Sequence, residues 1–468
     1  MADRFHYFYS YCDGITGDFM PFYHDGEFHI FHIAWKDWGH ISTKDFVTFK
    51  EYERAIVHGE PEDPDWDCFT GSVIEKDGVF HMFYCGHNDN NVKLGLPWEV
   101  MLHATSTDLT HWEKDKDFRL PCDLTKYAPN GWRDGFVVYD EAAKIYKMLI
   151  TSATKNPIHK RWGCIALATS KDLLKWKVEE PLYAPGIYDA HECPEMFKWG
   201  DKWYLVFSTF TRWWETHYRI SDSPEGPWET PKFDDLFDGR AFYAAKTVSD
   251  GNRRFIVGWT AAKAEPKDDI KYGWGGNLTA HEIIRDKDGT LRVKMIPEID
   301  ATFTKRKKVK AGDPVGEGNF EQRGRKFFID ASHSYLSVPL SKSGDACVIE
   351  GKIKMEKGTG AAGIIYRANY PKYDKWCALR IEPEKQRIYF DRSNKFFNDQ
   401  FYDETRPLHP SKNGVYTVKI FCYGTICIMY VNDRVALSVR NYEYLDGQIG
   451  FFCEEGKAEL SGFKVRTL

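Results

Sequence analysis

One segment recurs along this chain, in which a turn residue or a charged residue precedes a run of aromatic and aliphatic residues. It occurs five times, at residues 26–31, 78–83, 144–149, 201–207 and 252–259. A second repeat follows the first four copies. It joins a strand ending in Ser or Thr to a polar turn around Asp and an aromatic residue, at 40–46, 103–112, 167–176 and, more loosely, 219–228. Five copies of one supersecondary unit predict a five-bladed β-propeller.

A different pattern follows the fifth copy. Residues 302–324 are rich in charge and contain Gly and Pro, which is typical of a linker. Short strand-like runs without a helical period come next, and turn residues separate them, which favours a β-sandwich. A chain of 468 residues also exceeds the usual size of a single hydrophobic core. We therefore expect an all-β protein with a propeller over residues 1–301, a linker over 302–324 and a sandwich over 325–468.

Composition narrows the classes of function. The net charge of -5 provides no electrostatic basis for binding nucleic acid or an anionic membrane, and no apolar run is long enough to span a bilayer. The N-terminus lacks the basic start and apolar stretch of a secretory signal. Eleven cysteines are scattered along the chain, and we interpret Cys422 and Cys427, which lie in an apolar strand-like run, as core residues. We expect a cytoplasmic protein with reduced thiols.

Three acidic residues stand just before strands of the predicted propeller. Asp18 precedes the first recurring strand, Asp134 the third and Glu192 the fourth. Because the inner strands of a propeller converge on a central funnel, these carboxyl groups can face one another although they are far apart in sequence. Cleavage of a glycosidic bond needs two carboxyl groups flanking the bond, one ionised and one protonated. A third acid beside an arginine, as in Arg133-Asp134, can stay ionised and hold sugar hydroxyls.

Each of these residues also has an ordinary structural interpretation. An Asp that follows Gly, as Asp18 does, is often a turn residue, and Arg133-Asp134 could be a local ion pair. Glu192 could be a solvated surface residue, and the nearby Asp189 and Glu195 are rivals for any role that it has. The choice depends on whether the fold brings the three acids together.

Together with their surroundings, the three acids resemble the motifs of glycoside hydrolase family 32, the β-fructofuranosidase family, whose five-bladed propeller is shared with family 43. The resemblance covers most of the chain, including a C-terminal β-sandwich, and the order of the motifs is its most specific feature. It implies that Asp18 is the nucleophile and that Asp134 stabilises the transition state. It also implies that Glu192, within Glu192-Cys193-Pro194, is the general acid. The implied mechanism requires neither a metal ion nor a cofactor, and the implied partner is a small carbohydrate.

The resemblance also suggests residues that bind the sugar. Phe69-Thr70-Gly71-Ser72 resembles a family motif that lines the sugar site, residues 273–278 resemble a motif of the last blade, and one arginine stands beside the stabilising acid. The candidates for substrate binding are Trp38, Phe69, Ser72, Arg133, His191 and Trp274.

Three of these candidates have competing interpretations. His191 could tune or contact Glu192, but a histidine in a loop is about as often a polar surface residue. Trp38 and Trp274 could form stacking walls for a sugar, yet a position in the core or between blades is at least as frequent for tryptophan.

The chain departs from the family at positions that would border the sugar. The family has Asn-Asp-Pro-Asn-Gly around its nucleophile, and this chain has Gly17-Asp18-Phe19-Met20-Pro21. Gly135 replaces a Pro after the stabilising acid, and Ala241 replaces an Asp before Phe242-Tyr243-Ala244. The leading hypothesis is a retaining hydrolase of a fructofuranoside or a related furanoside. The alternatives are an inverting furanosidase like those of family 43, with Asp18 as the general base, and a carbohydrate-binding propeller without catalysis, which the altered motifs allow.

Overall fold

The computed structural model describes residues 3–5, 16–129, 131–342, 344, 346–392 and 404–468. Almost all regular structure in these residues is β-strand, which confirms the predicted all-β class. Its two helices are the short α1 (Asn90–Lys93) and α2 (Pro297–Ala301). Neither of these described helices is long or apolar enough to cross a lipid bilayer. The chain divides into two compact units.

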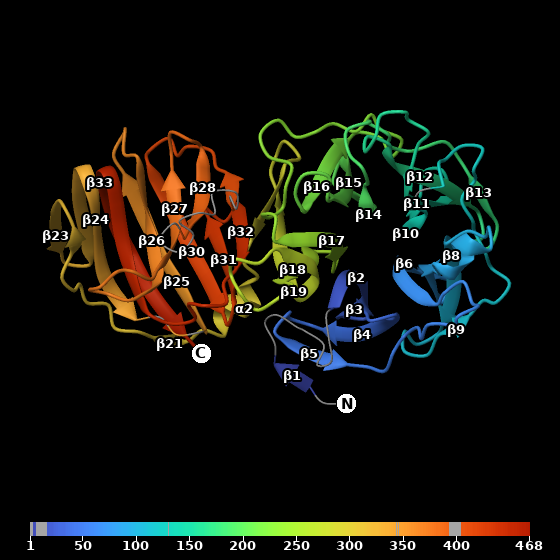
Figure 1. Ribbon diagram of the computed structural model, residues 1–468, viewed down its shortest axis with the longest axis horizontal. Coiled ribbons are helices and arrows are strands. Elements are labelled where there is room, and N and C mark those ends of the chain that lie inside the picture. Colours follow the sequence, from blue (N-terminus) through green and yellow to red (C-terminus); the bar gives the residue numbers. More distant parts are fainter. Residues whose placement is uncertain (1–2, 6–15, 130, 343, 345, 393–403) are drawn as a thin grey trace. The chain divides into compact units, whose positions relative to one another are not determined.

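The first unit contains the predicted five-bladed propeller, whose blades surround a common centre in Figure 1. The innermost strand of each blade comes first in sequence; these strands are β2 (Thr16–His24), β6 (Asp67–Lys76), β10 (Arg133–Asp140), β14 (Glu192–Trp199) and β17 (Phe242–Ser249). The second strands are the five recurring segments of the sequence, β3 (Glu27–Ala34), β7 (Val79–His87), β11 (Ile145–Ala153), β15 (Lys202–Thr209) and β18 (Arg254–Lys263). Each blade thus starts at the centre and builds outward.

The remaining strands complete the blades. The third strands are β4 (Asp37–Thr43), β8 (Glu99–Ser106), β12 (Gly163–Ser170), β16 (Glu215–Ser221) and β19 (Tyr272–Arg285). Outer strands of the first three blades are β5 (Thr48–Glu51), β9 (Glu113–Lys114) and β13 (Trp176–Val178), with β1 (Asp3–Phe5) paired to β5. In the fourth blade a single bridge from Ile220 to Glu229 takes the place of the outer strand. The short β20 (Leu291–Lys294) follows β19 in the chain and belongs to the second unit.

The second sequence repeat forms a tight turn between the third and outer strands. In the second blade the Ser106 hydroxyl accepts a hydrogen bond from the Leu109 N–H at 3.0 Å, and the Asp108 carboxylate accepts two more from the backbone N–H groups that follow. Leu109 has a positive φ of 63°. The same contacts recur at residues 43–48 and 170–175 in the first and third blades. The Ser/Thr-x-Asp pattern recurs because its side chains supply the partners that the backbone lacks in this turn.

One contact joins the last blade to the first. Thr16 in β2 pairs with Gly276 in β19, and the Thr16 hydroxyl donates a hydrogen bond to the Gly276 carbonyl at 2.9 Å. As a result, the strands of the first and last blades belong to one hydrogen-bonded sheet. The N-terminal and C-terminal ends of the propeller are therefore held together by β-pairing.

The second unit contains the predicted β-sandwich. Thirteen strands of the described chain form one hydrogen-bonded network there. They are β21 (Lys305–Arg306), β22 (Val315–Gly316), β23 (Asn319–Arg323), β24 (Lys326–Lys342), β25 (Ala346–Met355), β26 (Ala361–Ala368), β27 (Cys377–Glu382), β28 (Arg387–Asp391), β29 (Thr405–Pro407), β30 (Val415–Tyr423), β31 (Ile426–Val431), β32 (Val435–Arg440) and β33 (Gln448–Thr467). Their inward residues make one large apolar core that includes Val338, Ile364, Leu379 and Phe451, each fully buried.

Each of the two units consists of several segments of the sequence, so no single residue divides them. The second unit also includes residues 237–241 and 262–273, which lie between propeller segments, and begins its long C-terminal part at Leu291. The ranges 1–301, 302–324 and 325–468 stay predictions.

Candidate active site

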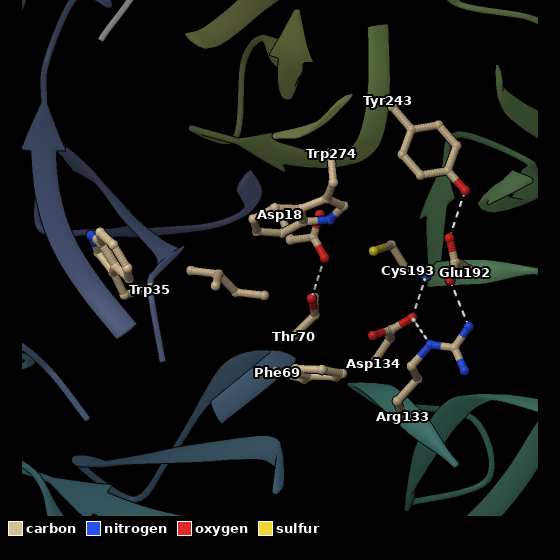
Figure 2. A pocket seen from close by; sticks show the side chains of 11 residues that line it. Asp18, Trp35, Phe69, Thr70, Arg133, Asp134, Glu192, Cys193, Tyr243 and Trp274 are labelled. Atoms are coloured by element: carbon tan, nitrogen blue, oxygen red, sulfur yellow. Dashed lines mark hydrogen bonds and ion pairs between the residues drawn. The ribbon is translucent and has the colours of Figure 1, made fainter. Parts of the chain in front are cut away.

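A pocket of about 390 Å³ lies in the propeller unit, and Figure 2 shows the side chains that line it. They are Asp18, Ile33, Trp35, Phe69, Thr70, Arg133, Asp134, Glu192, Cys193, Tyr243 and Trp274. Eight of the eleven come from the innermost strands, and all five blades contribute. The fold therefore brings the three acids named from the sequence to one place.

One irregularity, repeated in every blade, sets the direction of these side chains. Each innermost strand shifts register near its start, between Gly17 and Met20, Phe69 and Gly71, Arg133 and Phe136, Glu192 and Glu195, and Tyr243 and Lys246. A β-bulge of this kind leaves a residue unpaired and re-aims side chains that would otherwise alternate between the two faces of the strand. Four bulges contain a non-glycine residue of positive φ: Asp18, Asp134, Cys193 and Ala244. Backbone strain of this kind persists where the surrounding structure holds it, and it clusters at functional sites.

The Asp18 carboxylate is held by two neutral donors. The Thr70 hydroxyl donates to Oδ2 at 2.6 Å and the Trp259 indole N–H donates to Oδ1 at 3.0 Å. Burial raises the pKa of Asp18, repulsion from Asp134 adds to this, and the two hydrogen bonds offset it only in part, so the pKa is about 6. Asp18 is therefore mostly ionised at pH 7 and takes up a proton under mildly acidic conditions.

Asp134 and Glu192 are joined through Arg133. The Arg133 guanidinium donates to Glu192 Oε1 at 2.5 Å, and its Nε lies 3.8 Å from Asp134 Oδ2. Asp134 Oδ2 also accepts hydrogen bonds from the Thr151 hydroxyl at 2.8 Å and the Cys193 N–H at 3.0 Å. Burial lowers the pKa of Arg133, but the surrounding carboxylates raise it well above its ordinary value. Arg133 thus remains a permanent cation between two acids of neighbouring blades.

A further acid supports Arg133 from behind. Glu99 is buried, lies 3.7 Å from the Arg133 guanidinium and accepts a hydrogen bond from the Trp132 N–H at 2.7 Å. Burial alone would raise the pKa of Glu99, but His87, Arg133 and the Trp132 N–H lower it below its ordinary value. Sequence reasoning missed Glu99, because it starts a third strand and has no motif around it.

Tyr243 completes the surroundings of Glu192. Its hydroxyl donates to Glu192 Oε2 at 2.6 Å, so both carboxylate oxygens of Glu192 accept a hydrogen bond from a side chain. Burial raises the pKa of Tyr243 well above its ordinary value, and the Glu192 charge raises it further, which keeps the phenol protonated. Burial likewise raises the pKa of the Cys193 thiol, so that Cys193 is not a thiolate nucleophile at neutral pH.

Aromatic and aliphatic side chains form the rest of the pocket wall. Trp274 is 44% exposed and lies against Gly17, where a Cβ atom would stand 2.8 Å from the indole, so only glycine leaves room for this ring. Trp35 is 72% exposed and occupies the short turn between β3 and β4 with a φ of 63°, which is rare for a bulky residue. Phe69 and Ile33 complete this wall.

Three residues predicted to bind substrate do not line the pocket. Trp38 is fully buried and donates its indole N–H to the Phe69 carbonyl at 2.9 Å, which fixes the strand that carries Phe69. Ser72 is buried and joins two blades, because its hydroxyl donates to the Gly135 carbonyl at 3.0 Å. The His191 ring is fully buried against Tyr183, Tyr188 and Phe207, and burial lowers its pKa to about 3. Phe69, Arg133 and Trp274 do line it.

The two rivals of Glu192 also lie away from the pocket lining. Glu195 is buried and accepts hydrogen bonds from the Thr247 N–H and hydroxyl. Asp189 is half-buried, and its side chain lies 3.6 Å from Lys160. Of the three neighbouring acids in this stretch, Glu192 is therefore the one that faces the pocket.

Comparisons with known proteins agree with this arrangement. The model of the glycosyl hydrolases family 32 N-terminal domain matches residues 17–295, which contain all three acids, and the model of the family 32 C-terminal domain matches residues 317–467. Sucrose-6-phosphate hydrolase of Escherichia coli is 27% identical over 287 residues, which cover 56% of this chain and 56% of that protein. Raffinose invertase of Escherichia coli is 26% identical over 289 residues, with the same two coverages. The chain thus matches about half the length of these relatives.

Solved structures share the fold of the whole chain. Sucrose-6-phosphate hydrolase from Lactobacillus gasseri superposes with a TM-score of 0.74 at 17% identity, over 99% of this chain and 93% of that one. Fructan 1-exohydrolase IIa from Cichorium intybus superposes with a TM-score of 0.75 at 15% identity, over 99% and 97%. At these identities the likeness concerns the fold, a propeller followed by a sandwich.

Proposed function

The chain belongs to glycosyl hydrolase family 32, and from this premise we propose that it hydrolyses a β-fructofuranoside with retention of configuration at the anomeric carbon. The observation that carries the proposal is the meeting of three carboxyl groups from three blades in one pocket with aromatic walls. The names of two relatives, a sucrose-6-phosphate hydrolase and a raffinose invertase, support a fructoside as the substrate.

In the first step of the proposed mechanism Asp18 attacks the anomeric carbon while Glu192 gives a proton to the leaving oxygen. The C–O bond to the leaving group breaks, and a covalent fructosyl ester forms on Asp18. The Thr70 and Trp259 contacts support this role, since they hold both carboxylate oxygens of Asp18 in a fixed direction. Asp134 holds ring hydroxyls through charge-assisted hydrogen bonds.

Tyr243 and Arg133 prepare Glu192 for its role. As a proton donor, Glu192 needs one carboxyl oxygen that carries a hydrogen and points at the substrate. Tyr243 allows this because its hydroxyl can turn away from Oε2 and leave that oxygen free to carry a hydrogen, whereas the Arg133 guanidinium only donates and holds Oε1. The proton therefore belongs on Oε2, and Arg133 fixes the other oxygen.

In the second step Glu192 acts as a base. It takes a proton from a water molecule, the water oxygen attacks the anomeric carbon, and the ester bond to Asp18 breaks. Two displacements on the same carbon restore its original configuration. No cofactor or metal ion takes part in either step.

The apolar wall binds the faces of the substrate. Sugar rings present C–H groups that pack on aromatic faces, and Trp274, Phe69 and Trp35 offer such faces around the acids. Trp35 was not among the residues named from the sequence, and we assign it to the part of the substrate nearest the pocket mouth, because it is the most exposed of the three.

One experiment separates this proposal from its alternatives. Purified protein is incubated with fructosides, including sucrose, sucrose 6-phosphate and raffinose, and with arabinofuranosides, and the anomer of the first product is followed by NMR. Release of β-fructose before mutarotation supports the proposal. Early appearance of the inverted anomer favours a family 43-like inverting furanosidase with Asp18 as base. Binding of a sugar without turnover of any substrate favours a non-catalytic carbohydrate-binding propeller.

A cytoplasmic location is part of the same proposal. All ten cysteines of the described residues are free, and nine of them are buried. Free thiols on this scale are typical of a reducing compartment. Fractionation of cells that express the chain tests the location. The chain should appear with a cytoplasmic marker protein and not with an exported, disulfide-bonded one.

A further inference from the structure

A group of cysteines crosses three neighbouring strands of the sandwich. Cys347 in β25 lies directly opposite Cys422 in β30, and Cys422 lies directly opposite Cys427 in β31. All three side chains are buried to 1% exposure or less. The Sγ atoms of Cys422 and Cys427 are 2.9 Å apart, which indicates a contact closer than ordinary packing of two thiols.

A buried cation faces this group. Arg367 in β26 is 1% exposed, and one end of its guanidinium donates to the Gly424 carbonyl at 2.5 Å, in the turn between β30 and β31. Its Nε and Nη1 groups have no hydrogen-bond partner, and within the described residues no carboxylate forms an ion pair with it. A buried charge without a counter-charge costs several kcal/mol, roughly, so the surroundings of Arg367 have to supply a negative group.

The sulfur atoms are the available negative groups. The groups that interact electrostatically with Arg367 are Cys427 and Cys422, then Tyr366 beside it on β26 and Cys377 on β27. Burial would raise the pKa of Cys427, but the hydrogen bond with Cys422 and the charge of Arg367 lower it to about 7. A thiolate on Cys427 beside the Cys422 sulfur and facing Arg367 accounts for both the short sulfur contact and the buried cation.

We propose that Cys422 and Cys427 are a redox-active pair, which Arg367 holds in the thiol–thiolate state and which a peroxide converts to a cross-strand disulfide. Residues directly opposite one another on antiparallel strands have Cα atoms about 4.5–5.5 Å apart, within the range that a disulfide accepts. The pair also lies one residue from the Gly424-Thr425 turn, so a local opening of the hairpin end gives a small oxidant access without disturbing the rest of the sheet.

The chemistry balances with hydrogen peroxide as the oxidant. The Cys427 thiolate attacks one peroxide oxygen, the O–O bond breaks, and hydroxide leaves while Cys427 becomes a sulfenic acid. The Cys422 sulfur then attacks the Cys427 sulfur, the S–O bond breaks, and the Cys422 proton leaves with the hydroxyl group as water. Two thiols have lost two electrons and one peroxide has been reduced. Because Arg367 loses its counter-charge in the disulfide, it favours the reduced state at equilibrium and speeds the first step.

Trypsin gives a direct readout of this pair. Cleavage after Lys419 and Arg434 releases the peptide 420–434, which contains Cys422 and Cys427 and no other cysteine. The whole protein is treated with hydrogen peroxide, unreacted thiols are alkylated in denaturant, and the peptide is weighed. We expect a product lighter than the reduced peptide by two hydrogens and without alkyl groups, which dithiothreitol reverses. A fully alkylated peptide after treatment would overturn the proposal, and so would a cross-link to the peptide 343–352, which contains Cys347.

Variants distinguish the pair from its neighbour. Cys347→Ser removes the third thiol and should leave the reversible disulfide unchanged. Cys422→Ser should stop the reaction at a sulfenic acid on Cys427, which dimedone labels, or at a more oxidised acid, which the added mass of two or three oxygen atoms on the peptide identifies. Failure of Cys347→Ser to form the 422–427 disulfide would contradict the assignment. An unoxidised Cys427 in peroxide-treated Cys422→Ser would contradict it as well.

Arg367 and pH test the thiolate. With a pKa of about 7, about half of Cys427 is ionised at pH 7, compared with about one in a hundred for a thiol at its ordinary value of 9.0. Arg367→Leu should therefore slow disulfide formation by about tenfold or more at pH 7. In the unaltered protein the rate of disulfide formation should rise through pH 7 and level off above it. The titratable and charged groups around the pair are Cys347, Tyr366, Arg367 and Cys377. A rate that keeps rising up to pH 9 would overturn the thiolate even if the Arg367 variant failed to fold.

Discussion

The propeller and the sandwich are both built from antiparallel strands, but they use the irregularities of those strands in different ways. In the propeller a bulge occurs at the same position of all five innermost strands, and eight residues around these bulges line one pocket. In the sandwich the register shifts of β33 against its neighbours fall at unrelated positions, and its long strands enclose an apolar core. A β-bulge repeated at the same position of every blade brings polar side chains to one place, whereas register shifts at unrelated positions do not.

Because of this difference, the pocket residues of the propeller should matter for the proposed reaction, and the core residues of the sandwich should matter for stability. The three acids of the propeller are held by side-chain hydrogen bonds, and Asp18 and Asp134 also have a positive φ, so their replacement should change the proposed reaction far more than the fold. The sandwich core residues have the opposite character, because they contribute buried apolar surface and no reactive group to the pocket. Substitutions in the pocket should therefore lower activity and preserve stability, and substitutions in the sandwich core should do the reverse.

The largest expected effect is on catalysis. Asp18→Asn and Glu192→Gln are nearly isosteric and should each lower kcat on sucrose by roughly 10⁴-fold, because they remove the proposed nucleophile and the proposed proton donor. With an aryl fructoside, whose leaving group needs little protonation, the first step of Glu192→Gln should recover far more than that of Asp18→Asn. Burst kinetics measures that step. Equal losses on the aryl substrate would argue against these two roles.

The Asp18→Asn variant also tests how ionised Asp18 affects the stability of the fold. Folding raises the pKa of Asp18 from 3.8 to about 6, so the folded protein is stabilised at low pH by holding this proton, and that contribution disappears as pH rises through 6. At pH 7 the ionised Asp18 is thus unfavourable, and Asp18→Asn should melt at the same temperature as the unaltered protein or above it. Asp189→Asn, close to Glu192 but outside the pocket lining, is the matched control and should keep nearly full activity.

The next largest effect concerns the sandwich. Leu379 is fully buried in its core, and Leu379→Ala should lower the free energy of unfolding of this unit by about 2–5 kcal/mol, because it leaves a cavity. Denaturant unfolding measures the loss, and kcat/KM per folded molecule should stay unchanged. Leu445→Ala removes the same atoms at a position that is 38% exposed and should cost less than about 0.5 kcal/mol. A large loss of kcat/KM in Leu379→Ala would contradict the statement that the sandwich core contributes to stability and not to activity.

A smaller effect comes from pH. The proposed mechanism requires ionised Asp18, and the pKa of Asp18 is about 6, so kcat/KM should fall about tenfold per pH unit below pH 6. The profile is measured from pH 4 to 7 with an aryl fructoside, and circular dichroism at each pH excludes unfolding as the cause. Full activity at pH 4.5 would show that Asp18 is not the group that limits the acidic side.

The smallest expected effect is on binding at the pocket mouth. Trp35→Ala should raise KM by about 3- to 10-fold and leave kcat nearly unchanged, since a stacking contact contributes about 0.5–1.5 kcal/mol. Trp213→Ala is the control, because Trp213 is 49% exposed but does not line the pocket. Equal changes in the two variants would remove Trp35 from the proposed site.

The sequence predicted the arrangement of blades well because each blade repeats the same turn contacts and the same aromatic second strand. It predicted the direction of single side chains less well. Ser72 and His191 flank the bulges of their strands, and both are buried away from the pocket because a bulge changes which residues share a face. Trp38 lies in β4, whose pairing with β3 is regular, and it is buried in the core. Trp35 was missed for the opposite reason, since a bulky residue in a short turn carries no motif.

The support around Glu192 shows the same limit. Tyr243 stood within a recognised motif, but its hydrogen bond to Glu192 crosses from one blade to another, and no spacing in the sequence encodes that contact. Glu99 reaches Arg133 in the same way. Contacts between blades depend on the closed propeller, so they appear only once the fold is built.

In the proposed mechanism Asp18 forms a covalent bond with the sugar, and this bond can be detected directly. In Glu192→Gln an aryl fructoside should still react with Asp18, while the second step is slow because no base activates water, so the intermediate accumulates. Acid quenching in the burst phase, digestion and mass spectrometry locate the sugar. We expect one fructosyl group on the peptide that contains Asp18. A burst of the aryl leaving group without any sugar attached to the protein, or with the sugar on another residue, would contradict it.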